Sequence, residues 1–422
     1  MERKRSEWKR NEKNDLFVSF VKDTKEFFAT GKQPDSCARD MQYSLELQKN
    51  RLDEKGLSMN YEFIARGHLA DRTRITHKQE DARYKSKVCY RSCRFERKIF
   101  RGKKKVYSLS ANRNLYMTVM DTKGEQMVEN EDYVCPNCGA VSTVKGLLDG
   151  CDYCNTFFKI DELFPKVTNF FMVVDFGMNK REMIPRMILT MILSYPLWCI
   201  LLTGMFHYSE GFDILTSAVM GVILAVPATP FLGYALFAIL IMLSLVYHAV
   251  RESAMGFRAG GSDKKFENLM REYSPECSFP YFSGKVIGML RMLMYAKDVQ
   301  ELPFYTGGAV GDIFSDIVDA HHRGGLALRD FKVEGDYCYV TVDAYMDLVC
   351  AKRKVCDKRK VFRMMLKKNI TKPVDLNFSI SKIHCKNCDT SFDATRQCEC
   401  PSCGTRYEVA DDDWVVMSVE KM

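Results

Sequence analysis

The chain has 422 residues, a length that accommodates two or three domains with cores of their own. Its formal charge is +8, from 62 Lys and Arg against 54 Asp and Glu, and the excess is concentrated in short runs. Seventeen cysteines would suggest a disulfide scaffold in a short secreted chain, but the opening MERKRSEWKRNEKNDLF lacks the apolar core of a cleavable signal. We therefore expect a larger protein whose cysteines stay reduced in a cytosolic environment.

The N-terminal region, residues 1–132, is predicted to contain polar amphipathic helices over 8–30 and 34–55, followed by strands. Basic runs occur at 90–105 (YRSCRFERKIFRGKKK) and at 351–368 (AKRKVCDKRKVFRMMLKK). Such runs can bind phosphates of nucleic acid or of lipid headgroups. The interpretation we favour is a solvated strand face beside an anionic membrane.

The stretch CPNCGAVSTVKGLLDGCDYC, residues 135–154, contains two Cys-x-x-Cys pairs separated by twelve residues. Each turn aims two sulfurs at one point, so two facing turns form a tetrahedral thiolate site with Zn–S bonds of about 2.3 Å. Because four sulfurs fill the coordination sphere, the site is closed, which is typical of structural zinc. We predict a zinc ribbon over 133–165 with ligands Cys135, Cys138, Cys151 and Cys154.

The same arrangement returns in CKNCDTSFDATRQCECPSC, residues 385–403, where eleven residues separate the pairs. Cys398 is a rival for Cys400 as a ligand, and His384 stands next to the first cysteine. Gly139 and Gly404 each follow the second Cys of a pair, where a missing Cβ leaves room for amide groups turned toward the thiolates. We predict a second ribbon over 384–413 with ligands Cys385, Cys388, Cys400 and Cys403.

Two structural zinc ions per chain are the resulting expectation, with three alternatives left open. The same tetrahedral thiolates can hold iron. The eight cysteines can also be ordinary buried or disulfide-linked residues. A further metal pair at Cys89 and Cys93, or at Cys350 and Cys356, is weakly indicated because the spacings are not those of a zinc knuckle.

The likeness between the two ribbons extends beyond their ligands. CNTFFKIDELF and CGTRYEVADDDW align in an alternating pattern typical of a strand, with Phe158 against Tyr407 and Ile160 against Val409. Further upstream, RKIFR at 97–101 matches RKVFR at 359–363. We interpret this as a degenerate internal duplication of a basic strand followed by a ribbon, although the short upstream match can arise by chance.

A long apolar region, residues 187–250, lies between the two ribbons. MILTMILSYPLWCILLTGMF, at 187–206, has twenty residues without a charge, enough to cross a hydrocarbon core of about 30 Å. The second tract, at 214–250, has thirty-seven residues and is interrupted at Pro227 and Pro230, where we expect a bend. It crosses either once as a long bent span or with an added re-entrant piece; a true turn at the prolines would add a third crossing.

Both flanks of this region are basic, whereas the connecting loop HYSEGFD carries only acidic charges. By the positive-inside rule both flanks remain in the cytoplasm, which requires an even number of crossings. We therefore expect an integral protein of the bacterial plasma membrane with two crossings and both termini cytoplasmic. The flanking cations are Lys180, Arg181 and Arg186 before the region, and Arg251, Arg258, Lys264 and Lys265 after it.

After a linker at 251–265, a soluble domain is predicted over 266–383. FENLMREY, SGKVIGMLRMLMYAKD and VGDIFSDIVDAHH predict three helices, the last over 310–322, and strands follow from LALRDFKV onward. In the strand DYCYVTVDAYMDLV, Cys338 and Val340 share one face with Val342 and Ala344. The predicted fold class is mixed α+β: a cone of three helices on a curved antiparallel sheet, a membrane-spanning helical hairpin and two ribbons.

This order of parts resembles the membrane-associating domain of the family of the mitochondrial inner-membrane translocase subunit forty-four, a cone of the nuclear transport factor two-like class. Together with CPNCG and CPSCG, it resembles bacterial membrane proteins that carry this domain with a ribbon. The resemblance implies a non-enzymatic module at the membrane surface that docks proteins or lipid. Those relatives carry one ribbon, so a degenerate second cone within 1–132 lies outside the family pattern.

Catalytic signatures are weak in this sequence. It contains no GxxxxGK, HExxH or GxSxG motif, and His321 and His322 beside Asp319 are better explained as the polar end of a helix. We expect a membrane-anchored scaffold, not an enzyme, that binds a protein partner and contacts membrane lipid. The alternative is a binder of nucleic acid or anionic lipid through the basic strands, and an enzyme that uses the cone pocket is less favoured.

Overall fold

The structure of the protein, a computed structural model, divides into two compact units. Unit 1 joins Met1–Asp175 to Arg258–Met422, and unit 2 is Phe176–Phe257. The structure describes all residues except 1–14, 67–72, 81–83, 123–130, 136, 148–149, 156–164, 176–179, 275–276, 372–381, 394–396, 398, 408 and 410–412.

The N-terminal half of unit 1 opens with two helices, α1 (Leu16–Thr30) and α2 (Arg39–Glu54). Asp15 caps α1 by accepting a hydrogen bond from the Phe17 amide, and α1 ends at Gly31 in the left-handed conformation. An antiparallel sheet follows, in the order β1-β3-β4-β7 with β2 paired to β3. Its strands are β1 (Ser58–Ala65), β2 (Arg74–Glu80), β3 (Tyr84–Arg101), β4 (Lys104–Thr122) and β7 (Lys166–Val174).

The C-terminal half of unit 1 repeats this order. Two helices, α6 (Ser262–Met270) and α7 (Phe279–Tyr295), and the short 3-10 turn η2 (Val299–Glu301) precede an antiparallel sheet of order β8-β9-β10-β13. The strands are β8 (Ile317–Glu334), β9 (Tyr337–Ala351), β10 (Val355–Asn369) and β13 (Val415–Lys421). As expected, Cys338, Val340, Val342 and Ala344 lie on one buried face of β9.

Each half is therefore a helix pair followed by a four-step antiparallel meander. In the N-terminal half, β1 and β2 pair with opposite ends of β3 and together take the place of β8. Both ribbons lie between the third and fourth steps of the meander, so β7 and β13 return to the sheet after the ribbon. The matching RKIFR and RKVFR segments fall on β3 and β10, which are not equivalent strands.

The third helix predicted over 310–322 is wrong. Turns occupy Gly311–Asp316, and β8 begins at Ile317. Among the described residues from Ser262 to Met422, the α-helices are therefore α6 and α7. The physical reason is that β8 is buried on both faces at its start. Ile317 belongs to the core of the C-terminal half and Val318 to that of the N-terminal half, so the usual alternation of a strand is absent from the sequence.

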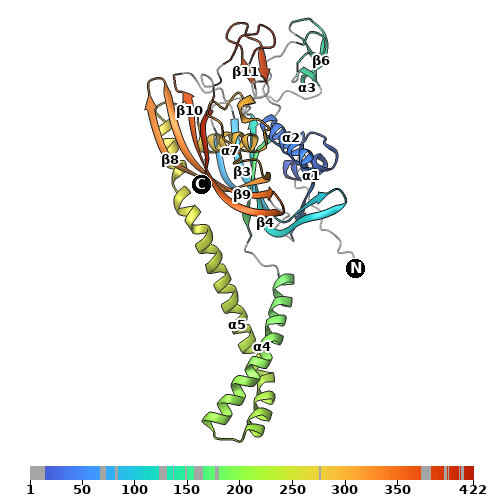
Figure 1. Cartoon of the computed structure of the whole chain (residues 1–422), viewed down its shortest axis with the longest axis vertical. Helices are drawn as coiled ribbons and strands as arrows, with labels where there is room; N and C mark the ends of the chain where they lie inside the picture. The colour runs from blue at the N-terminus through green and yellow to red at the C-terminus, as the bar shows by residue number, and fades with distance from the viewer. Residues whose placement is uncertain are drawn as a thin grey trace. The chain divides into compact units, whose positions relative to one another are not determined.

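The two halves share their interior. Val318, Val349 and Ala351 of the C-terminal half pack into the core formed by α1, α2 and the first sheet. Helices α2 and α7 contact each other, as do strands β7 and β8. Strand β10 also contacts β4, and Figure 1 shows the strands of both halves within unit 1.

Unit 2 consists of α4 (Lys180–Ser209) and most of α5 (Ile214–Ala259). Pro227 and Pro230 lie inside α5, which is one helix throughout and bends along its length (Figure 1). The helices pack closely: a Cβ added at Gly221 would lie 2.8 Å from the Thr203 amide nitrogen, and one at Gly233 would lie 3.0 Å from Met191 Cα. Gly233 follows Gly221 along α5, whereas its partner Met191 precedes Thr203 along α4. The two helices are therefore antiparallel.

Two segments of unit 2 are long and apolar enough to cross a membrane, Met183–Ser209 and Ile214–Phe231. In the most apolar eighteen residues of each segment, only 6% and 17% are buried. A core helix of a folded domain would be mostly buried, which these segments are not. A shorter apolar segment, Gly233–Tyr247, continues α5.

Candidate metal centres and a buried polar cluster

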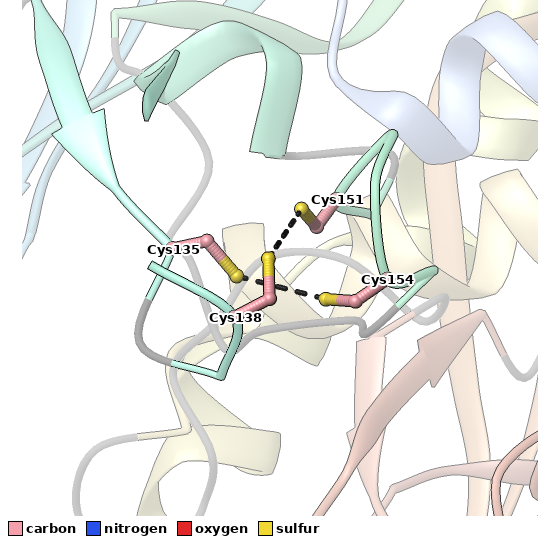
Figure 2. A group of neighbouring side chains, drawn as sticks. All are labelled: Cys135, Cys138, Cys151 and Cys154. Atoms are coloured by element: carbon pink, nitrogen blue, oxygen red, sulfur yellow. Dashed lines mark hydrogen bonds between the residues drawn. The ribbon is translucent and has the colours of Figure 1, made fainter. Parts of the chain in front are cut away.

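The four predicted cysteines of the first ribbon converge. Cys135 follows β5 (Asp132–Val134), which pairs with β6 (Val141–Thr143), and Cys151 comes after the short helix α3 (Val144–Leu147). The sulfurs of Cys135 and Cys154 are 3.7 Å apart, and so are those of Cys138 and Cys151 (Figure 2). All four sulfurs lie within 4.8 Å of one another.

The second ribbon brings Cys385, Cys388, Cys400 and Cys403 together in the same way. The sulfurs of Cys385 and Cys403 are 3.4 Å apart, and those of Cys388 and Cys400 are 3.5 Å apart. A tetrahedron with Zn–S bonds of about 2.3 Å has sulfur–sulfur edges of about 3.8 Å, so both sets fit a thiolate-bound ion of this size. Cys400 is thus a member of the cluster, whereas Cys398 lies outside the described residues.

The turns that carry the cysteines share one backbone feature. The residue after each second Cys has positive φ: Gly139 at 75°, Asn155 at 52°, Asp389 at 56° and Gly404 at 70°. A Cβ at either glycine would meet nothing within 4 Å, so the glycine supplies conformational freedom and not space, which corrects the expectation from the sequence.

Asn155 and Asp389 were missed by the sequence analysis as members of this set. Asn and Asp are the non-glycine residues that most readily adopt the left-handed conformation, so their position after a Cys-x-x-Cys was the available signal. In each turn the amide of this residue donates to the carbonyl of the first Cys, for example Asn155 to Cys151 at 2.8 Å and Gly404 to Cys400 at 2.9 Å. The four turns are therefore built alike.

Hydrogen bonds to sulfur favour the thiolate form that a metal requires. The hydroxyl of Thr405 lies 3.2 Å from the Cys403 sulfur, and this hydroxyl and the Thr405 amide lower the pKa of the Cys403 thiol to about 6. Thr390 is the counterpart, with its hydroxyl 3.3 Å from the Cys388 sulfur.

The other cysteine pairs do not form clusters in the part of the chain that the structure describes. Cys89 and Cys93 are buried on β3 in the apolar core, and burial raises the pKa of the Cys89 thiol to about 11. Cys350 and Cys356 face each other across β9 and β10. Neither pair joins a group of three or more potential metal ligands among the described residues.

The acid and histidines considered as catalytic candidates lie on β8, inside the interface between the two halves. Asp319 is 1% exposed, His321 5% and His322 3%, so the predicted polar helix end is instead a buried strand. The Tyr61 hydroxyl donates to Asp319 at 2.5 Å and Gln48 donates to the same oxygen at 2.8 Å.

The second oxygen of Asp319 accepts hydrogen bonds from Arg97 and from His321 Nε2, the latter at 3.0 Å. Burial alone would raise the pKa of Asp319, but the charges of His321 and Arg97 outweigh it and hold this pKa well below its usual range. Arg97, from the basic run at 90–105, is thus 3% exposed and ion-paired inside the protein, contrary to the expectation of a solvated face. The cluster joins α2, β1 and β3 of one half to β8 of the other.

His322 points away from this cluster. Its Nε2 donates to the carbonyl of Gly325 at 2.9 Å, and its ring meets that of Phe171 on β7 at 5.9 Å. Burial lowers the pKa of His322 to about 4, so the ring is neutral near neutral pH.

Comparison of the chain with protein-family models, with curated proteins and with solved structures gave no match. Two closed sets of four cysteines can hold metal ions without leaving a coordination position for substrate.

Proposed function

We propose that this protein is a membrane-anchored binding platform whose folded unit lies on the cytoplasmic side and docks a protein partner there. In this proposal α4 and α5 form a two-crossing hairpin in the plasma membrane. Both ribbons bind structural zinc, and no part of the chain is catalytic.

The observation that carries the topology is the contact between the halves of unit 1. The residues before α4 and those after α5 share a core and the buried ion pair of Arg97 and Asp319. Because segments packed in one core occupy one compartment, the chain between them must cross the membrane an even number of times. The close antiparallel packing of α4 and α5 at Gly221 and Gly233 supports two crossings.

The cytoplasmic orientation rests on charge and on the cysteines. Basic residues flank the apolar region at both ends and only acidic charges occupy its loop, the pattern of a hairpin with cytoplasmic ends. Thiolate sites also need a reducing compartment while they assemble.

Zinc is the metal that best fits the donor sets. Four thiolates at tetrahedral separations suit zinc, and closed sites of this kind stabilise their fold directly. Such sites do not activate water, and the burial of Asp319, His321 and His322 keeps them from any substrate. These two points support a non-enzymatic role.

An exposed apolar surface on the first ribbon supports docking of a protein partner. Val134 is 57% exposed, Val141 61% and Tyr153 75%, and Val134 pairs with Val141 between β5 and β6. Aromatic residues on such a surface are typical anchors of protein interfaces. The resemblance of 266–383 to the translocase-subunit family agrees with a docking role and remains part of the proposal.

The topology is tested by reporters that are active only in the cytoplasm, fused after Lys180, Ser209 or Lys265 of the full chain. We expect signal at the first and third positions and none at Ser209. Silence after Lys265 together with signal after Lys180 would mean an odd number of crossings and would overturn the proposal.

Docking is tested by a photo-crosslinking amino acid placed at Tyr153 in living cells. We expect one dominant adduct with another protein at Tyr153 and none at the control Lys332, which is 63% exposed on the opposite half. Equal, weak crosslinking at both positions would argue against a partner on the first ribbon.

A further inference from the structure

The repeat of the two halves places two basic turns at equivalent positions. The β3–β4 turn carries Arg101, Lys103, Lys104 and Lys105, and the β9–β10 turn carries Lys352, Arg353 and Lys354. Each turn joins the second and third steps of its meander. All seven side chains are exposed.

The two turns lie close together on unit 1. Asp357, at the start of β10, accepts hydrogen bonds from the Tyr107 hydroxyl at 2.6 Å and from Arg97 at 3.0 Å. Tyr107 follows the first turn and Asp357 follows the second. Val106 and Val355, directly beside the turns, pack against the same apolar core.

The charge of these turns is not neutralised by the protein. Among the described residues, only Lys352 of the seven has an ion pair, 3.9 Å from Asp316, and Asp316 also lies near Lys358 and Lys421. The other acid at this end, Asp357, is held by Arg97 and Tyr107. Six of the seven cations on the two turns therefore have no ion pair among the described residues and are available to anions outside the protein.

We propose that the paired β3–β4 and β9–β10 turns bind the anionic headgroups of the membrane in which the chain is anchored. Lysines and arginines on an anionic membrane surface raise association by about fivefold each, and the effect declines within about one Debye length. Tyr107, an aromatic residue close to the first turn, is held by Asp357 and covered by Arg97, so it is not free to stack on a base. This observation favours a membrane surface over a nucleic acid.

This inference rests on the proposed membrane anchoring, and the test separates the two. The purified full chain is placed in lipid nanodiscs of phosphatidylcholine alone, or with about one third phosphatidylglycerol to create an anionic surface. Acylation of single lysines by a water-soluble reagent is followed by mass spectrometry. The reporters are Lys103, Lys104 and Lys354; the references are Lys25 and Lys332, exposed by 59% and 63%.

We expect the reporter lysines to react at least about threefold more slowly in anionic discs, and the difference to disappear at about 0.5 M salt. The references should react equally in both discs. The triple variant K103E/K104E/K105E should restore the reactivity of Lys354 because the turns act together, whereas the control K25E/K145E/K332E should not.

Three outcomes would overturn the inference. Chains that do not co-purify with discs at all would refute the anchoring itself. Chains that insert but react equally in both lipids would refute only the role of the turns. Protection of the reporters by an added RNA or DNA oligonucleotide, without protection by anionic lipid, would assign the turns to nucleic acid instead.

Discussion

The two ribbons hold their cysteines alike but are attached to the protein differently. In the second ribbon, Phe392 is 1% exposed and Tyr407 8%; their rings meet edge to face at 5.6 Å and belong to the core that contains Trp414. In the first ribbon, the described apolar cluster contains Cys135, Cys151 and Leu147 and is separate from the main cores, and Tyr153 is 75% exposed. Local turn geometry thus fixes the cysteine clusters, whereas tertiary packing makes one ribbon part of the core and leaves the other a separate cluster.

The largest expected effect comes from removing one cysteine ligand from each ribbon and comparing the two variants. A structural zinc supplies on the order of 10 kcal/mol to the folding of its own ribbon, so Cys151→Ser and Cys400→Ser should each lose one zinc equivalent in metal analysis. Because the second ribbon shares the main core, Cys400→Ser should also speed amide hydrogen exchange in β13. Cys151→Ser should leave exchange in β7 nearly unchanged.

If both variants speed amide hydrogen exchange equally in the strand after the ribbon, the two ribbons are not attached differently. A single zinc equivalent in the unmodified protein would be more damaging, since one of the two clusters would then not be a metal site. Serine at Cys89, which is buried but outside both clusters, controls for the general effect of removing a buried thiol.

The next effect concerns what joins the two halves. Asp319→Asn removes the buried carboxylate partner of Arg97 and leaves only the exposed Asp357 as its ion-pair partner, at 3.0 Å. We expect this change to cost about 3 kcal/mol in the free energy of unfolding. Asp343→Asn is the matched control: Asp343 is also buried, but its partners Arg329 and Arg363 are 35% and 39% exposed and can regain water. We expect a loss of about 1 kcal/mol there, measured by urea unfolding followed through tryptophan fluorescence.

Equal losses in the two variants would mean that the Asp319 cluster is no stronger than a surface ion pair. In that case the halves would be joined mainly by their apolar contacts. The result would remove Arg97 and Asp319 from the argument for one compartment but leave the shared core.

The third effect tests the attachment of each ribbon directly. Phe392→Ala should cost about 3 to 5 kcal/mol because it opens a cavity in a core that cannot fully relax. Tyr153→Ala should change the free energy of unfolding by less than about 0.5 kcal/mol because it removes an exposed ring. Comparable losses would show that the first ribbon is held as firmly as the second.

The cysteine clusters were predictable from the sequence because their geometry is local. The Cys-x-x-Cys spacing predicted the two sets of four cysteines whose sulfurs come together in the structure. The apolar tracts and most helices were equally local signals. Asn155 and Asp389 were missed because the αL requirement was assigned to glycine alone.

The interface between the halves was not predictable, since it depends on contacts far apart in the chain. Gln48 and Asp319 are 271 residues apart, and the sequence around one gives no indication that it contacts the other. Because β8 is buried on both faces at its start, the strand lacks the usual alternation of buried and exposed residues, and this segment was interpreted as a helix. The strand β13 was also missed, because it follows the second ribbon and no further strand was expected there.

The smallest effect is the pH dependence contributed by His322 at this interface. Its pKa is about 4 in the folded protein, lowered by burial from the ordinary 6.5, so the unfolded chain binds a proton at a higher pH than the folded one does. The stability from keeping this ring neutral is present above pH 6.5 and is lost as the pH falls through about 4, on the order of 3 kcal/mol in all.

His322→Gln keeps an amide donor for the Gly325 carbonyl but cannot take up a proton. Its free energy of unfolding should therefore fall less steeply than that of the unmodified protein between about pH 6.5 and pH 4. Acid also releases zinc from thiolates, so metal content is measured at each pH and must fall equally in both proteins. Parallel stability curves would show that His322 is not buried as the structure has it and does not contribute to the acid sensitivity of the contact between the halves.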